Sequence, residues 1–280
     1  MIFYKTSSFG NDFIHIDENE LPDPKADRGL LAREICDTHR AVGADGVVYY
    51  RPSRKAGVPG GNRGEGFDFQ VYNRDGGKAE LSGNGMAGLA AVLFQRRRAS
   101  SPLTLRAPIG QRRIELRRRR GPVFQLEVEI GRPDFSNRAF FPFLQDKRDH
   151  YVLEGMEFHP VSVGNPHAVI LCREPVAPGR LAALGEKIES HPMFPRRVNV
   201  EFVWIGAAAS CRVFFYERGV GPTLASSTGS AAVFAVLRRL KKATDRLTID
   251  CGAEAIAVRW RGGIFIDNFT RLVCRGEYFH

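Results

Sequence analysis

The sequence of 280 residues predicts an α/β (α+β) protein with two pseudo-symmetric halves, each a curled mixed β-sheet around a central helix. Short β-rich runs recur along the whole chain, with helical patterns between them. A helix start that begins with serine occurs twice, in "LSGNGMAGLAA" at 81–91 and in "LASSTGSAA" at 224–232. The helices that follow are apolar on nearly every face, which is typical of a helix surrounded by other elements. We expect the halves to comprise residues 1–121 with 268–280, and 122–267, with the active site in the cleft between them.

The first half begins with two β-rich runs around the loop "TSSFGND" and continues with a helix over 27–40. Leu30, Leu31 and Ile35 have helical spacing within it. A strand "DGVVYYRP" precedes the Gly-rich polar segment 53–66, which we expect to be a loop and whose role stays open. "FDFQVYN" alternates as a strand, and "RDGG" turns it. The remaining elements of this half are the serine-led helix from 84 to about 98 and strands near 102–107, 112–118 and 123–130.

The second half repeats this alternation. "FHPVSVGNPHAVILC" is expected to be a strand with a loop in it, and "RLAALGEKIESH" an amphipathic helix. "VNVEFVWIG" and "SCRVFFYERG" are typical of strands, and the second serine-led helix is expected from about 228 to 242. Four expected strands finish the chain: "DRLTIDC", "AIAVRW", "GIFIDN" and "TRLVCRGEYF".

The spacing around the two serines is the same in both halves. Asn73 ends a strand and Ser82 follows nine residues later, while Glu217 ends a strand and Ser226 follows nine residues later. A glycine stands three residues beyond each serine. Internal similarity at a matched spacing indicates a duplicated structural unit.

The charge of the chain is basic, with a formal net charge of +10 and arginine runs at 96–98 and 111–120. Arginines of the second run flank Ile114, Leu116 and Val123, as on a solvated strand face. No aromatic residues are interleaved with them for base stacking, so we expect a solvated face and no nucleic-acid partner.

The cysteines, histidines and apolar runs exclude several classes of protein. Five cysteines without CxxC spacing predict a reducing cytoplasmic interior, and neither a disulfide framework nor a zinc site. The histidines form no i, i+4 pair with an acid between them, so we expect no metal. The apolar run "MAGLAAVLF" is far shorter than the ~20 residues of a membrane span. The N-terminus lacks the pattern of a signal peptide.

The two helix starts predict an anion-binding site, because a helix N-terminus presents unpaired N–H groups and partial positive charge. Serine is also a preferred N-cap, so simple capping is the alternative for either segment alone. The duplication with matched spacing favours a site. The residues that would present such groups are Gly83, Asn84 and Gly85 in one half, and Ser227, Thr228 and Gly229 in the other.

Six motifs occur in order along the chain: "FGNDF" (9–13), "VGADGVV" (42–48), "YNRDGGKAELSGNG" (72–85), "VGNPHAV" (163–169), "VNVEF" (198–202) and "ERGVGPTLASSTG" (217–229). By these motifs the chain resembles, over essentially its whole length, the diaminopimelate epimerase family of cofactor-independent amino-acid epimerases. The resemblance implies conversion of L,L- to meso-diaminopimelate, a lysine and peptidoglycan precursor, by transfer of the α-proton. It implies a small amino-acid or dicarboxylate substrate and no cofactor, with a homodimer among the oligomeric states left open.

In that family two cysteines exchange the α-proton, and the matching positions here are Ser82 and Ser226. Ser227, Pro222 and "MAG" (86–88) also depart from the family's usual Gly, Glu and Ile-Arg-Cys. These changes indicate a natural divergent branch.

The exchange of thiol for hydroxyl has a large energetic consequence. A thiol has a pKa near 8.5, which a helix N-terminus lowers, whereas the pKa of an alcohol is far higher and close to that of water. The gap of ~7 pKa units corresponds to on the order of 10 kcal/mol. A helix dipole supplies ~0.3–1 kcal/mol, and up to ~2 kcal/mol. Either serine could therefore act as a base only with help from a neighbouring group.

Two such neighbours are implied by the resemblance, His167 in "GNPHAV" and Glu217 in "ERGVG". Each could activate a serine or act as the base itself. The alternatives are a satisfied core histidine and a strand-end salt bridge. The family positions that grip the substrate are matched by Asn11, Asn73, Asn165, Asn199 and Arg218, with Gly83 and Asn84 at the first anion-binding turn and Ser227 and Thr228 at the second.

Three functions are consistent with these residues. The first is an isomerase that acts on a diaminopimelate-like amino acid by α-proton transfer. The second is a one-base isomerase, tautomerase or dehydratase of the same fold, in which Glu217 or His167 moves the proton. The third is an amino-acid-binding homologue that does not turn its ligand over.

Overall fold

The computed structural model describes residues 1–53, 66–145, 148–206, 209–252 and 255–279. The Gly-rich segment expected as a loop lies outside these residues, apart from its two ends. The described residues form 17 strands, four α-helices and the short 3-10 helix η1 (Glu18–Glu20). The predicted mixed class of helices and strands is therefore confirmed.

The chain divides into two compact units, Met1–Glu129 with Asp267–His280, and Ile130–Ile266. One boundary falls inside strand β8 (Val123–Gly131) and the other inside strand β17 (Ile264–Glu277). The boundary expected after residue 121 lies in the turn that precedes β8. Pairing of β8 with its neighbour β7 keeps most of the strand in the first unit.

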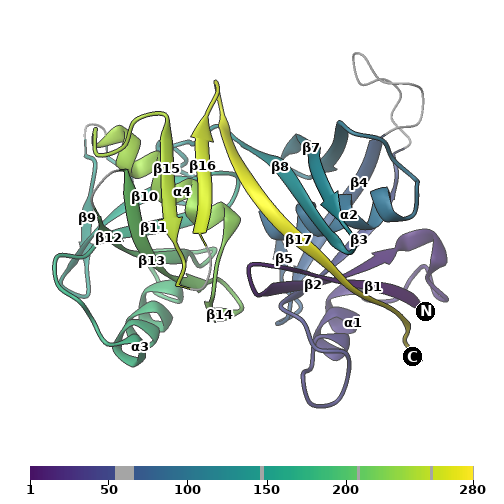
Figure 1. The fold of residues 1–280 in the computed structure, drawn as a ribbon. Coiled ribbons are helices and arrows are strands. Elements are labelled where there is room, and N and C mark those ends of the chain that lie inside the picture. Colours follow the sequence, from purple (N-terminus) through teal and green to yellow (C-terminus); the bar gives the residue numbers. More distant parts are fainter. Residues whose placement is uncertain (54–65, 146–147, 207–208, 253–254, 280) are drawn as a thin grey trace. The chain divides into compact units, whose positions relative to one another are not determined.

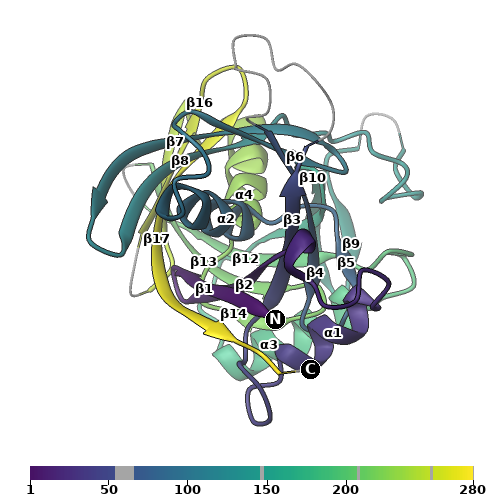
Figure 2. The same cartoon turned by 90° about the vertical axis from the view of Figure 1, so that its right-hand side faces the viewer.

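Among the described residues of the first unit, eight strands close into a barrel in the order β1–β2–β3–β4–β6–β7–β8–β17, since β17 also pairs with β1. Helix α2 (Gly83–Gln95) contacts β1, β2 and β3, and every residue from 83 to 93 is buried. Figures 1 and 2 show α2 among these strands. The strands not yet given are β1 (Ile2–Ser8), β2 (Asn11–Asp17), β3 (Gly46–Pro52), β4 (Gly66–Asn73), β5 (Lys78–Ala79), β6 (Leu103–Ala107) and β7 (Gly110–Arg120).

Helix α1 (Arg28–Ile35) packs its buried face, which includes Leu31 and Ile35, against side chains of β2 and β3. Asp27 begins the helix, because its carboxylate accepts the first amide N–H groups. The expected helix continued to residue 40. It ends at Ile35 because the Asp37 carboxylate accepts the N–H groups two and three residues further on and holds a separate turn.

The second unit has the same plan. Its strands pair in the order β9–β10–β11–β12–β13–β15–β16–β17, and helix α4 (Ser227–Arg239) contacts β10, β11, β12 and β16. Residues 227–237 are all buried. The strands are β9 (Tyr151–Leu153), β10 (Met156–Ser162), β11 (Pro166–Leu171), β12 (Asn199–Ile205), β13 (Ser210–Glu217), β14 (Gly221–Thr223), β15 (Arg246–Asp250) and β16 (Ala255–Trp260).

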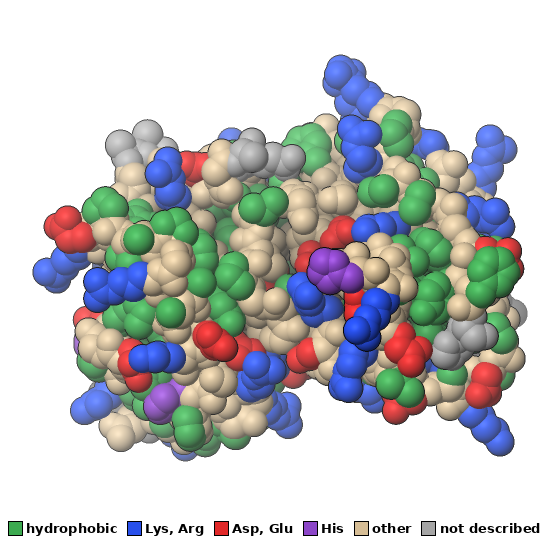
Figure 3. All heavy atoms as spheres, turned by 90° about the horizontal axis from the view of Figure 1, so that it is seen from below, with side chains coloured by type: hydrophobic (Ala, Val, Ile, Leu, Met, Phe, Trp, Pro, Cys, Tyr) green, Lys and Arg blue, Asp and Glu red, His purple; other side chains and the backbone are tan. Residues whose placement is uncertain are grey.

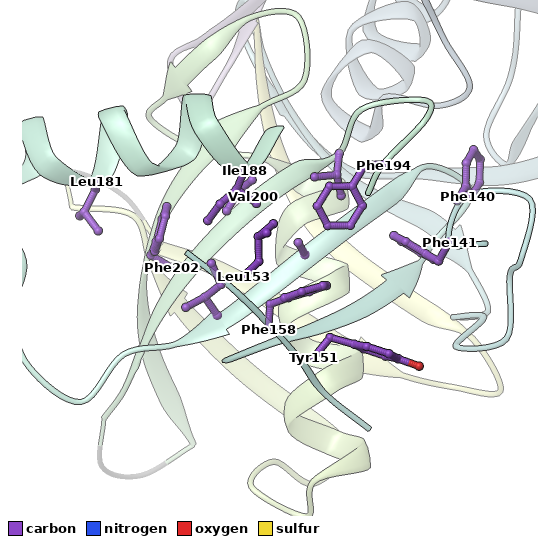
Figure 4. Close-up of a cluster of buried hydrophobic side chains, with 13 residues drawn as sticks. Phe140, Phe141, Tyr151, Leu153, Phe158, Leu181, Ile188, Phe194, Val200 and Phe202 are labelled. Atoms are coloured by element: carbon purple, nitrogen blue, oxygen red, sulfur yellow. The ribbon is translucent and has the colours of Figure 1, made fainter. Parts of the chain in front are cut away.

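Helix α3 (Pro178–Glu189) is amphipathic, as its sequence predicts, and packs on the sheet of the second unit. Figure 4 shows Leu181 and Ile188 of this helix near Val200 and Phe202 of β12. Aromatic side chains complete this core, which includes a cluster of edge-to-face ring contacts.

Both central helices make the same kind of connection. Helix α2 lies between β4 and β6 in the chain, and these two strands pair in parallel. Helix α4 lies between β13 and β15, which also pair in parallel. Parallel strands need a crossover connection, and a helix supplies it. The duplication inferred from serine spacing thus appears in each unit as strand, turn, serine and helix.

One expectation at the end of the chain is wrong. The runs "GIFIDN" and "TRLVCRGEYF" do not form two strands but lie in the single strand β17. The expected break fell between Asn268 and Thr270. In the structure both are fully buried and hydrogen-bonded to one another, while Phe269 between them is exposed, so the alternation of a strand continues.

The arginine run on β7 agrees with a solvated strand face. Ile114 is fully buried, whereas most arginine side chains of the strand are exposed or half-buried. Arg117 pairs with Glu115 and Glu127 at 2.8 and 2.9 Å. On the face drawn in Figure 3, basic side chains are likewise interspersed with acidic ones. In the part of the chain that the structure describes, no helix has the length and apolar character needed to cross a membrane.

Replacing Gly88 with alanine is expected to lower the free energy of unfolding by about 1–3 kcal/mol. A Cβ atom there would lie 2.3 Å from the Thr6 hydroxyl and 2.5 Å from Nε2 of His15. The control is Gly179→Ala in α3, where no atom lies within 4 Å, and its stability is expected to stay the same or rise by up to about 1 kcal/mol. Chemical denaturation measures both, and equal stability of Gly88→Ala and wild type would contradict the packing.

His15 is expected to make the fold sensitive to acid. The side chain is fully buried, its Nε2 bonds to the Thr6 hydroxyl at 2.8 Å, and burial lowers its pKa to about 3. The unfolded chain therefore binds a proton near pH 6.5 that the folded chain binds only near pH 3. The contribution of neutral His15 to the free energy of unfolding is fully present above pH 6.5. It falls as the pH drops below 6.5 and is smaller by about 3 kcal/mol at pH 4.5.

The measurement is denaturant unfolding at pH 7 and pH 4.5 for wild type and His15→Gln. The variant is expected to lose less stability between the two pH values, because its side chain does not titrate. His150→Gln, at a half-exposed histidine, is the control and should behave as wild type. Identical losses in wild type and His15→Gln would show that His15 titrates normally in the fold.

Candidate active site

The two serines singled out by the sequence occupy equivalent positions in their units. Ser82 and Ser226 are the N-caps of α2 and α4, with backbone angles of φ −139°, ψ 120° and φ −134°, ψ 123°. Each hydroxyl accepts the N–H of the glycine three residues on, at 3.1 Å. The prediction that both helices begin at these serines is confirmed, and the helices start one residue earlier than expected.

In the second unit the serine is also paired with a carboxylate. The Ser226 hydroxyl donates to Oε2 of Glu217 at 3.1 Å, and the Thr223 hydroxyl donates to Oε1 of the same residue at 2.8 Å. Glu217 ends β13, and the short β14 returns the chain antiparallel to it before the helix begins. The turn therefore brings a carboxylate to the helix N-terminus, where Ser226 is nearly completely buried.

The polar contacts extend from this serine to the core of the second unit. Thr228 lies 3.5 Å from the Ser226 hydroxyl and accepts the Asn165 amide at 3.3 Å. The Asn165 oxygen contacts Nε2 of His167 at 2.9 Å, and Nδ1 of His167 contacts Glu201 at 2.7 Å. The Asn165 nitrogen faces Thr228 and its oxygen faces the ring, so the two ring nitrogens of His167 face an amide oxygen and a carboxylate oxygen. Both ring nitrogens are engaged, which favours the satisfied core histidine over a base.

Gly229 is required where it stands because Glu201 approaches the helix closely. A Cβ atom at Gly229 would lie 2.8 Å from Oε1 of Glu201 and 2.8 Å from the Phe215 ring. The glycine three residues after Ser226 thus admits the His167–Glu201 pair beside the helix start.

Asn199 and Arg218 are held together at the start of β12 and the end of β13. The Asn199 amide donates to the Pro166 carbonyl at 2.8 Å, and its oxygen accepts the Arg218 N–H at 3.0 Å. The Arg218 guanidinium donates to the Arg196 carbonyl at 3.0 Å. Glu189 of α3 accepts the N–H of Gly219 at 3.0 Å and so anchors the turn that carries Arg218.

In the first unit the polar groups are amides. The Asn84 amide donates to the Asn11 oxygen at 3.0 Å, and the Asn11 amide donates to Oδ2 of Asp45 at 2.6 Å. Burial raises the pKa of the Asp45 carboxyl, whereas the hydrogen bonds from Asp12 N–H and Asn11 act in the opposite direction. Asn73 ends β4, as expected, and its N–H donates to the Gly77 carbonyl.

Within each unit the structure therefore brings most of the predicted residues together. In the first unit a hydrogen bond joins Asn84 to Asn11, beside Ser82 and Gly83. In the second unit hydrogen bonds join five predicted residues, which are Ser226, Glu217, Thr228, Asn165 and His167. Ser227 is the first residue of α4. The residues that sequence reasoning missed are Asp45, Glu189, Glu201, Thr223 and Asn268. Asp45 and Glu201 lie inside quoted motifs, so attention to buried acids could have found them, whereas no local pattern marks Glu189 or Asn268.

Comparisons with known proteins show the family and the fold of the chain. A family model described as diaminopimelate epimerase matches residues 3–136 and 160–263. The chain is 32% identical over 288 residues to the diaminopimelate epimerase of Carboxydothermus hydrogenoformans, with all of both chains covered. It is 28% identical to that of Methanococcus aeolicus, over 99% of this chain and 98% of the other.

Solved structures share the fold at low identity. A hydroxyproline epimerase from Agrobacterium vitis has a TM-score of 0.68 at 14% identity and covers 99% of this chain and 91% of its own. A PhzF-family phenazine biosynthesis protein from Bacillus anthracis has a TM-score of 0.65 at 14% identity, over 100% and 99%. The family model and the relatives show that the chain is an isomerase. Within that class, the chain belongs to the diaminopimelate epimerase family.

Loss of either capping hydroxyl is expected to destabilise the fold. Ser82→Ala should lower the free energy of unfolding by about 1 kcal/mol, because an amide at the start of α2 loses its acceptor. Ser226→Ala should lower it further, because the hydroxyl also donates to Glu217. The measurement is chemical denaturation, with Ser100→Ala at an exposed serine as the control. Wild-type stability in both variants would show that neither serine caps its helix.

Proposed function

We propose that the protein is a cofactor-independent isomerase that moves the α-proton of a diaminopimelate-like amino acid. Full-length similarity to diaminopimelate epimerases supports the substrate class. In the proposal Arg218 pairs with the distal carboxylate, as a guanidinium does with geometric specificity. Asn11, Asn73, Asn165 and Asn199 orient the amino and carboxyl groups. The five free cysteines favour a reducing cytoplasmic setting.

The observation that carries the proposal is the hydrogen bond from Ser226 to Glu217, at 3.1 Å. A hydroxyl at a helix N-terminus lies on the order of 10 kcal/mol from ionisation, and the helix dipole cannot supply that. A carboxylate paired with the hydroxyl can accept a proton, either directly from the substrate or through Ser226. The N–H groups at the start of α4 would stabilise the charge that develops on the substrate carboxylate.

His167 has a supporting role in this proposal. Its Nε2 contacts the Asn165 oxygen, and its Nδ1 contacts Glu201. The ring thereby holds the Asn165 amide toward Thr228. We assign His167 to positioning and Glu217 to proton transfer.

The two units differ at the position nine residues before the serine, and this difference favours a second candidate. The second unit has the carboxylate of Glu217 there, whereas the first has the amide of Asn73, which cannot take up a proton near neutral pH. Two-base epimerisation would require Ser82 to exchange a proton as well. With one base, a proton leaves and returns on the same side, as in a tautomerase or another one-base isomerase.

Incubation with L,L-diaminopimelate in D₂O distinguishes these functions. Deuterium at the α-carbon with inversion is expected for the epimerase, and deuterium with retention for one-base exchange. Glu217→Gln is expected to slow exchange at least ~100-fold, because the amide cannot accept the proton. Glu186→Gln, at an exposed acid of α3, is the matched control.

Two outcomes would count against the proposal. Binding of the amino acid without exchange would leave a binding protein. Unchanged exchange in Glu217→Gln would remove this carboxylate from the mechanism. If Ser82→Cys/Ser226→Cys acquires or raises epimerisation, the substrate contacts are correct and only the proton-transfer pair has changed.

A further inference from the structure

A chain of six hydrogen-bonded side chains crosses the first unit, and the function considered so far uses two of them. The chain begins at Ser8, the last residue of β1, and passes through two residues of β17 to the first turn of α2. It continues through β2 and ends just before β3. The members in order are Ser8, Thr270, Asn268, Asn84, Asn11 and Asp45, at donor–acceptor distances of 2.7, 2.7, 3.0, 3.0 and 2.6 Å.

In this network of six side chains, every hydrogen bond is donated toward Asp45. Asp45 at the far end can only accept while it is ionised, so the Asn11 nitrogen faces it and the Asn11 oxygen faces Asn84. The same reasoning makes Asn84 donate to Asn11 and accept from Asn268.

The donors at the Ser8 end of the network are assigned in the same way. The Asn268 nitrogen is directed at Asn84, so its oxygen accepts the Thr270 hydroxyl. Ser8 then donates to Thr270, whose own hydrogen is already used. The direction in which each group donates thus depends on the orientation of the next group. The orientation of all three amides is therefore set by the Asp45 carboxylate.

The burial of these groups makes their orientation costly to change. Asn268 and Thr270 are fully buried, and Ser8, Asn84 and Asn11 are at most 4% exposed. Turning one amide over would place two oxygens or two N–H groups against each other away from water, which costs about 1–3 kcal/mol per unsatisfied group. A connected network in a low-dielectric interior is held more firmly than its separate pairs.

We propose that Asn268 is a positioning residue that sets the amide orientation of Asn84 and, through it, of Asn11. Asn11 orients the substrate in the proposed function, and the family resemblance places Asn84 at the first anion-binding turn. The inference rests on the proposed function for its effect on affinity. The effect of Asn268 on amide orientation does not rest on the proposed function. Asn268 lies 184 residues from Asn84 in the sequence and reaches it only because β17 closes the barrel beside α2.

The test is Asn268→Asp, which keeps the shape of the side chain and makes its donor dependent on pH. When the introduced carboxyl is protonated, it can donate to the Asn84 oxygen and preserve the wild-type direction. When it is ionised it can only accept, so the Asn84 amide must turn over. Burial raises the pKa of such a carboxyl, so the change is expected as the pH rises from 5 to 9.

Other titratable groups lie on the elements packed against this network of side chains. His15 of β2 faces α2 at Gly88, and β8, which pairs with β17, carries Glu127 and Glu129. Helix α2 has no titratable side chain between residues 83 and 95. At the far end Asp12 and Arg74 act on Asp45, with Lys5 bonded to Asp12. On β17 the neighbouring charges are Asp267 and Arg271. They are present in wild type as well, so wild type measured over the same pH range separates their effect from that of the introduced carboxyl.

The first readout needs neither substrate nor turnover. In protein labelled with ¹⁵N at asparagine, the Asn84 side-chain signals should shift with pH in Asn268→Asp and stay constant in wild type. Asn19→Asp, at an exposed asparagine of the same unit, is the control and should leave them constant. Constant Asn84 signals in Asn268→Asp would overturn the inference, whatever the protein binds.

The second readout is calorimetric affinity for L,L-diaminopimelate. Asn268→Asp should bind within about twofold of wild type at the low end of the range and at least ~10-fold more weakly at the high end. Recovery at low pH is a result that a merely structural defect does not give. Thr270→Val keeps the volume and removes the donor to Asn268, so a smaller loss without pH dependence is expected.

The two readouts separate the two possible failures. If wild type does not bind the amino acid, the proposed substrate is wrong, and the Asn84 signals still decide the inference. If wild type binds and Asn268→Asp binds equally at every pH, Asn268 does not position the substrate contacts.

Discussion

Both units depend on one constraint: a helix that begins among buried strands must satisfy its first N–H groups without bulk water. Ser82 and Ser226 meet it with nearly the same backbone conformation and the same hydrogen bond. Each helix also connects two parallel strands, so the sheet determines where its N-terminus lies. Polar side chains from neighbouring strands are then brought to this point, which is why each candidate cluster forms around a helix start.

The same backbone arrangement supports different chemistry in the two units. Around Ser226 the structure gathers a carboxylate and hydroxyls, together with a histidine bonded to a second acid. Beside Ser82 it joins asparagines in a chain that ends at Asp45. An amide network orients groups without exchanging protons, whereas a carboxylate can do both. The two units therefore differ in whether their polar groups can transfer a proton more than in their backbone geometry. The protein is thus not a simple duplicate of one unit.

Glycines allow both central helices to pack closely against the neighbouring strands. Gly88 allows α2 to approach the Thr6–His15 pair, and Gly229 allows α4 to approach Glu201. A side chain at either glycine would push the helix away from the strand that carries those polar groups. The small residues that made both helices look apolar in the sequence thus allow buried polar groups of neighbouring strands to lie against the helices.

What the sequence by itself determined is local. The serine-led starts and the apolar runs after them predicted both helices, and the matched spacing from Asn73 to Ser82 and from Glu217 to Ser226 predicted a duplicated unit. The motifs predicted the family and most of the polar residues near the helix starts. What only the tertiary structure decided is which groups meet: Glu201 with His167, Glu189 with the turn of Arg218, and Asn268 with Asn84. It also joined the last two expected strands into β17. Periodicity and capping act over a few residues and are visible in a single sequence, whereas these partners depend on strand pairing between segments far apart in the chain.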